Sequence, residues 1–135
     1  MLPRLRDALR PGAFLAIFDD QTLPPPWQAQ LDAIIPRYST NRDFEPYRLL
    51  DELAARGLFR FAGSRATAPV TFEQTVEAYV QSFHSRNGFS RERQPAADAD
   101  AFDDAVRQMI APHARRGRIE LQLRSIVHWG WPCRE

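Results

Sequence analysis

The chain has 135 residues, of which 44% are hydrophobic, and its formal net charge is +1. This length is sufficient for one compact domain, and the near-neutral charge gives no electrostatic basis for binding nucleic acid or an anionic membrane surface. The lone cysteine, Cys133, excludes an internal disulfide and a cysteine-based zinc site. No apolar run approaches the roughly 20 residues that span a bilayer. The N-terminal residues are too charged for a secretory signal, so we expect a cytoplasmic protein with no membrane or nucleic-acid partner.

The N-terminal residues predict a helix followed by a strand. Leucines recur at helical spacing over residues 2–9, and Pro11-Gly12 ends the pattern. Residues 13–18 form an unbroken apolar run, which is typical of a strand buried on both faces in a parallel sheet covered by helices. Asp19-Asp20 follow directly. We expect them at the edge of the sheet where α/β proteins place their ligands.

The rest of the chain predicts four more helices and two more strands. The helices are indicated by apolar residues that recur every three or four positions. Their ranges are 27–35, 49–54, 72–83 and 102–110. Thr71 and Gln74 have capping-box spacing at the start of the third of these. The strands are expected at 58–62 and at 119–127, and the second alternates apolar and polar residues.

The segment Leu5-Arg6-Asp7-Ala8-Leu9-Arg10-Pro11-Gly12-Ala13-Phe14-Leu15-Ala16-Ile17 resembles a known family. It is similar to the junction of a late helix and the next strand in class I S-adenosylmethionine-dependent methyltransferases, with Ala13 in place of the usual second glycine. The order of the following elements is similar to the C-terminal half of the small-molecule enzymes of that superfamily. The resemblance therefore covers essentially the whole chain.

The resemblance implies an α/β fold that is part of a Rossmann-like methyltransferase sheet. This sheet would have three strands, two of them parallel and the last antiparallel between them. About five helices would accompany it in a single domain over residues 1–135. The edge of the strand at 13–18 would be open, which favours pairing with a second copy or with a complementing N-terminal half.

The resemblance also implies a function: methyl transfer from S-adenosylmethionine to a small-molecule acceptor, without a metal. The glycine-rich loop that holds the cofactor in that family is missing, because no two of the six glycines lie two residues apart. We therefore expect the substrate-side portion of such an enzyme, inactive alone and supplied with cofactor-binding strands from upstream residues or another polypeptide. Alternatives are a non-catalytic interaction module that pairs through its sheet edge, or an unrelated α/β domain.

Candidate catalytic residues are Asp19, Asp20 and His84. The two aspartates would face the acceptor from the end of the strand at 13–18; alternatively, their side chains cap the next turn. His84 ends the predicted helix 72–83, in the region that lies over the acceptor pocket of the resembling enzymes. A base there would deprotonate the acceptor.

Candidate substrate-binding residues are Ser82 and Arg86 beside His84, and His128 and Trp129 at the end of the last strand. Arg86 would bind a carboxylate or a phosphate. The alternative is a solvated helix end. His128 and Trp129 would form the wall of an apolar pocket or stack on a flat substrate; the alternative is that the tryptophan closes the core.

Overall fold

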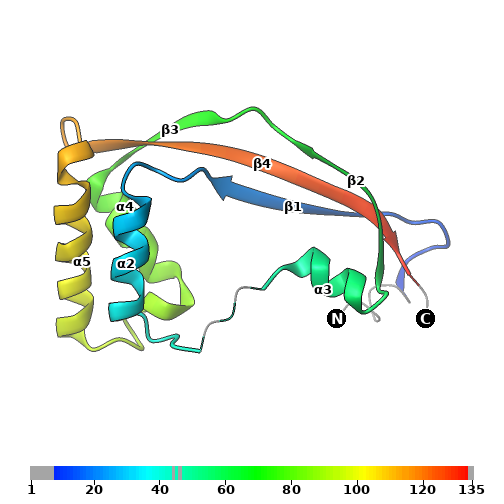
Figure 1. Cartoon of the computed structure of the whole chain (residues 1–135), viewed down its shortest axis with the longest axis horizontal. Helices are drawn as coiled ribbons and strands as arrows, with labels where there is room; N and C mark the ends of the chain where they lie inside the picture. The colour runs from blue at the N-terminus through cyan, green and yellow to red at the C-terminus, as the bar shows by residue number, and fades with distance from the viewer. Residues whose placement is uncertain (1–7, 44, 46, 134–135) are drawn as a thin grey trace. The chain divides into compact units, whose positions relative to one another are not determined.

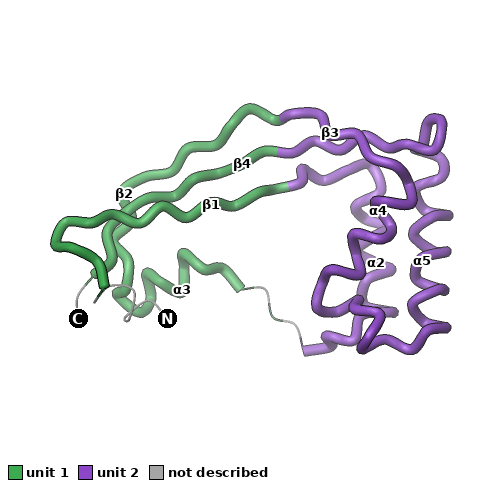
Figure 2. The backbone as a smooth tube through the Cα atoms, turned by 180° about the vertical axis from the view of Figure 1, so that it is seen from behind, with its two compact units in different colours: residues 1–21, 45–69, 124–135 green, residues 22–44, 70–123 purple. Residues whose placement is uncertain are grey.

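A computed structural model describes residues 8–43, 45 and 47–133 (Figure 1). The strands are β1 (Leu15–Thr22), β2 (Phe59–Ala66), β3 (Val70–Thr75) and β4 (Arg118–Pro132). The α-helices are α2 (Gln28–Tyr38), α3 (Leu49–Ala55), α4 (Val76–Ser82) and α5 (Ala96–Ile110). The chain divides into two compact units (Figure 2). Unit 1 comprises residues 1–21, 45–69 and 124–135, and unit 2 comprises 22–44 and 70–123.

The four strands form one sheet in which β4 pairs with each of the other three. The order is β1-β4-β2, and β3 also pairs with β4. β2 pairs with the C-terminal part of β4 and β3 with its N-terminal part, both antiparallel. β1 also runs opposite to β4, since Gln21 contacts Arg124 while Asp20 contacts Ser125. β4 therefore contributes residues to both units.

The expected Rossmann-like sheet of three strands is wrong. The sheet has four strands and is antiparallel, and residues 70–75 form β3 where the start of a helix was expected. Valine, threonine and phenylalanine in this segment favour a strand once a partner is available, and β4 is long enough to supply one. α4 begins only at Val76, where the Thr75 hydroxyl accepts a hydrogen bond from the Ala78 N–H at 3.0 Å. Four α-helices lie within the described residues, and most of the further helix expected at residues 2–9 lies outside them.

The strand expected at 13–18 is present at a shifted position, but it is not buried on both faces. β1 begins at Leu15 and continues to Thr22, and none of its residues is buried. The side chains of Phe14 and Phe18 are 66% and 75% exposed. An apolar run without polar alternation does not by itself say what covers it, and an antiparallel sheet can leave a face open. Burial of residues 13–18 therefore cannot be used to argue that a neighbouring strand is missing beside them.

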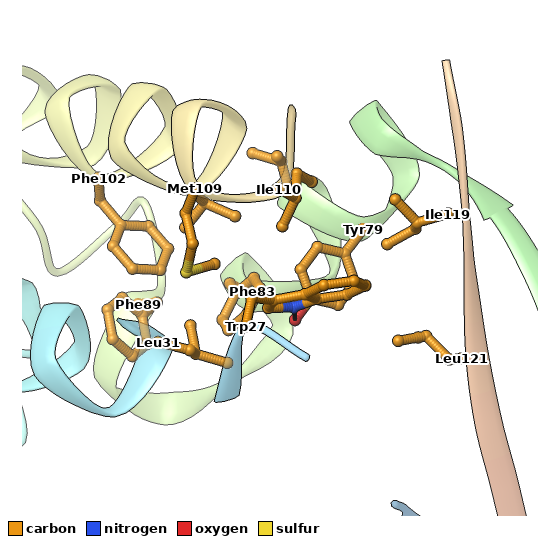
Figure 3. Close-up of a cluster of buried hydrophobic side chains, with 12 residues drawn as sticks. Trp27, Leu31, Tyr79, Phe83, Phe89, Phe102, Met109, Ile110, Ile119 and Leu121 are labelled. Carbon is orange, nitrogen blue, oxygen red and sulfur yellow. Dashed lines mark hydrogen bonds between the residues drawn. The ribbon is translucent and has the colours of Figure 1, made fainter. Parts of the chain in front are cut away.

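Unit 2 has an aromatic core on which α2, α4 and α5 pack (Figure 3). Phe102 from α5 stacks on Phe89 with ring centroids 4.4 Å apart and meets the edge of Phe83 at 5.3 Å. The Trp27 indole N–H donates to the Tyr79 hydroxyl at 3.0 Å, so both polar tips are satisfied inside the core. This core fixes the two short 3₁₀ turns that follow α4, Phe83–Ser85 and Asn87–Phe89, where several candidate residues lie.

Unit 1 has a smaller core beneath β2. Leu53 from α3 and Phe59 from β2 are its buried apolar side chains. Gly130 in β4 faces Phe61 in β2, and the backbone of Arg60 occupies the space where a β-carbon at position 130 would lie. Only glycine therefore allows β2 and β4 to approach at this point.

Candidate functional site

Unit 2 contains an open cavity of about 420 Å³. Its apolar wall comes from α2, β3 and β4, and its polar side comes largely from α2 and the region of α4. Its apolar lining consists of Pro25, Leu31, Ile35, Phe72, Leu121 and Leu123. Its polar lining consists of Thr22, Gln28, Gln74, Tyr79, Ser82 and Arg86. Apolar walls with a few convergent polar groups are typical of small-molecule sites.

Two predicted substrate-binding residues, Ser82 and Arg86, line this cavity together. The Ser82 hydroxyl donates to the Tyr79 carbonyl oxygen at 2.7 Å, so its oxygen remains free to accept. The guanidinium of Arg86 lies 4.4 Å from the centroid of the Phe83 ring. Among the described residues, no carboxylate forms an ion pair with it. Arg86 can therefore offer its donors to an anionic ligand.

Tyr79 brings a neutral hydroxyl to the same cavity. Burial raises the pKa of this hydroxyl, and the hydrogen bond from Trp27 opposes that shift. Tyr79 therefore stays protonated at neutral pH, and it can position a ligand but does not supply a base.

A second cavity in unit 2, of about 640 Å³, shares Ile35 and Arg86 with the first. It lies between the segment after α2 and the 3₁₀ turn Asn87–Phe89, and Arg42 lines it as well. Arg86 thus borders both of these cavities. The sequence does not reveal this arrangement, because Arg42 and Arg86 are far apart along the chain.

His84 is not among the described residues that line these two cavities. Its Nδ1 lies 2.8 Å from the Phe89 carbonyl oxygen, and its Nε2 lies 2.8 Å from Oδ1 of Asp103. With both ring nitrogens engaged, its placement favours a structural role. Asp103, which sequence reasoning missed, is only 2% exposed, and its other oxygen accepts from Arg91 at 2.6 Å. A carboxylate within the apolar stripe of α5 was the signal that could have identified it.

Asp19 and His128 both line a cavity of about 500 Å³ in unit 1. Nδ1 of His128 is buried and has no hydrogen-bond partner among the described residues. Both aspartates lie within β1 rather than after its end, and each is engaged locally. Asp19 accepts from the Gln21 side chain at 3.2 Å, while Asp20 accepts from the Ser125 hydroxyl. The structure thus brings Asp19 together with His128 at one cavity.

Trp129 belongs to the sheet rather than to a described cavity. A β-carbon at Gly63 in β2 would lie 2.7 Å from the Trp129 ring, so this glycine accommodates the indole. The register places the two residues directly opposite each other. Trp129 therefore contributes packing between β2 and β4.

The described residues do not fit the nucleotide part of S-adenosylmethionine. A glycine cradle for that group needs backbone that a ligand can approach. The space beside Gly63 is instead occupied by the Trp129 ring, and the space beside Gly130 by the Arg60 backbone. Gly12, Gly57 and Gly117 have left-handed backbone conformations but are isolated from one another along the chain. Nor does any group of three or more His, Cys, Asp or Glu side chains in this part of the chain have the arrangement of a metal site.

Taken together, fold and cavities define an α/β protein with a sheet built on β4 and cavities of the size of a small molecule. No protein-family model matches the chain, and no curated protein matches it significantly. Across the part of the chain that the structure covers, the helices are too short or too polar to traverse a bilayer.

Proposed function

We propose that this chain forms the acceptor-binding part of an S-adenosylmethionine-dependent methyltransferase that acts on a small molecule. The observation that carries the proposal is the cavity of about 420 Å³ in unit 2, which is lined by Ser82 and Arg86. These are residues for which the family resemblance implies a position facing the acceptor. The Pro11-Gly12 junction supports the same family.

The residues of this cavity would bind and orient the acceptor. Leu31, Phe72 and Leu121 remove the apolar body of the acceptor from water, while Arg86 and the Tyr79 hydroxyl fix its polar end. Holding the acceptor atom in one place removes much of the entropic barrier to an in-line displacement. None of the described lining residues is Asp, Glu or His, so this cavity supplies positioning rather than proton transfer.

The test uses the longest in-frame polypeptide encoded at the locus, incubated with methyl-labelled S-adenosylmethionine and a panel of small acids, amines and phenols. We expect labelled product, and we expect Arg86→Ala to raise KM for the acceptor. Arg65→Ala is the matched control, because Arg65 is exposed on β2 in the other unit. Absence of label transfer to every acceptor class, in a polypeptide that binds the donor, would refute the proposal.

One observation favours a second candidate function, a non-catalytic module that pairs with a second copy of itself. β1 stands at an end of the order β1-β4-β2, and Phe14 and Phe18 beside that edge are exposed. An exposed apolar edge is a template for strand pairing. Light scattering should then detect a defined dimer that Phe18→Lys dissociates. A monomer at all concentrations would exclude this function.

A further inference from the structure

We propose that the larger cavity of unit 2 binds a small amphipathic carboxylate, with Arg42 and Arg86 holding the acid group. This site goes beyond the proposed function, which places the methyl acceptor in the cavity of about 420 Å³, and the two cavities share Ile35 and Arg86. The binding itself follows from the lining of the cavity, and it can be measured without a methyl donor.

The walls of this cavity are held by hydrogen bonds between two segments that are distant in sequence. The Thr40 N–H and hydroxyl both donate to the Gly88 carbonyl oxygen, at 2.9 and 3.2 Å. The Ser39 hydroxyl accepts from the Asn41 N–H at 3.1 Å, which shapes the start of the loop that carries Arg42. The segment after α2 is thereby fixed against the turn Asn87–Phe89, so the cavity does not depend on a ligand to form.

The charge in this cavity has one sign. Of the described residues that line it, only Arg42 and Arg86 are charged, and no acidic side chain faces them there. The Arg86 guanidinium rests on the ring of Phe83, which is fully buried, so less of its conformational freedom is lost when a ligand binds. A guanidinium group matches the geometry of a carboxylate, which accepts paired N–H bonds, and this cavity offers two such groups.

An amide donor adds to these cations. The Oδ1 atom of Asn87 accepts from Arg93 at 2.5 Å, which leaves the amide N–H groups of Asn87 to donate elsewhere. Asn87 lines the cavity, as does Asn41. The polar lining is therefore rich in donors, which favours an acceptor-only ligand group such as a carboxylate.

The remaining lining requires an apolar body on the same ligand. Ile35, Pro36 and Phe89 form this part, and the cavity of about 640 Å³ is within the range of roughly 300–1,000 Å³ found for small-molecule sites. A bare phosphate ion would leave these apolar walls in contact with water. An acid with an aromatic or aliphatic chain satisfies both parts.

Calorimetry on the whole chain tests this with three probes: 4-phenylbutyrate, its neutral analogue 4-phenylbutanol, and inorganic phosphate. We expect one-to-one binding of the acid, at least about tenfold weaker binding of the alcohol, and no heat with phosphate. Arg42→Gln and Arg86→Gln should each weaken binding of the acid about tenfold. Arg65→Gln, in the other unit, should leave it unchanged.

Equal affinity for the acid and the alcohol would overturn the proposal, as would phosphate binding as tightly as the acid. Comparing the three probes requires no variant, so it stays decisive if a substitution unfolds the protein. Amide shifts confined to Gly88, Phe89 and the loop at 39–42 would locate the acid. If the acid binds but no acceptor of the panel is methylated, the proposed function fails while the site stands.

Discussion

The Nε2 atom of His84 lies 2.8 Å from Oδ1 of Asp103, and the two side chains are only 10% and 2% exposed. Nδ1 of His84 lies 2.8 Å from the Phe89 carbonyl oxygen, so each ring nitrogen faces an oxygen atom. Asp103 also accepts from Arg91 at 2.6 Å. The buried side chain of Asp103 therefore has two side-chain partners, and its contact with His84 connects α5 to the turns beside Arg86.

Removing this carboxylate should destabilise the protein strongly. In Asp103→Asn, the neutral amide loses the charge that pairs with Arg91 and presents an N–H group to one of the two partners of the carboxylate. We expect a loss of about 3 kcal/mol in the free energy of unfolding, measured by urea denaturation. The neighbouring Asp104 is the control, because its side chain is 70% exposed in its ion pair with Arg107. Asp104→Asn should cost below about 1 kcal/mol. Similar losses in the two variants would contradict the assignment.

The ion pair between Glu77 and Arg107 should make stability depend on acid pH. Hydrogen bonds from Arg107 hold the pKa of Glu77 below its usual value of 4.5. A pKa that is lower in the folded state contributes stability above the unfolded pKa, and this contribution is lost as the pH falls. The melting temperature should therefore exceed that of Glu77→Gln at neutral pH, with the gap closing below a pH of about 4.5.

The control for this pH series is Glu92→Gln, since Glu92 is exposed and has no ion pair among the described side chains. Its melting temperature should follow the wild type at every pH. If the gap between the wild type and Glu77→Gln stays constant on acidification, Glu77 does not contribute through its charge.

Close approach of β2 and β4 makes Gly130 sensitive to any side chain. In Gly130→Ala the new methyl group would meet the Arg60 backbone and lie 2.7 Å from the Phe59 ring, so we expect a loss of about 3 kcal/mol in the free energy of unfolding. Gly63→Ala should cost about 1 kcal/mol, because there the methyl group meets only the Trp129 side chain. Chemical denaturation measures both, and the reverse ranking would disprove this packing.

S-adenosylmethionine should not bind tightly to residues 1–135 alone. The chain has no pair of glycines separated by one residue. In the sheet, neighbouring groups occupy the space beside Gly63 and Gly130 that a ligand would need. Calorimetry should show no one-to-one binding in the micromolar range. Such binding would mean that the described cavities hold the donor by another route.

The sequence by itself determined the location of most helices and strands. Helical periodicity identified α2, α3 and α5, although α5 begins at Ala96, within a segment of loop composition. The strands expected at 58–62 and 119–127 are present as the longer β2 and β4. Periodicity succeeds here because it records which side of an element faces a core.

Only the tertiary structure decided how residues 70–75 pair, what covers β1, and which polar side chains meet. A strand depends on a partner elsewhere in the chain, so the choice between strand and helix for Phe72 followed from the length of β4. The contacts of His84 with Asp103, and the shared cavity of Arg42 and Arg86, join residues that are distant along the chain. Such contacts arise from packing of the whole unit, which local residue patterns do not encode.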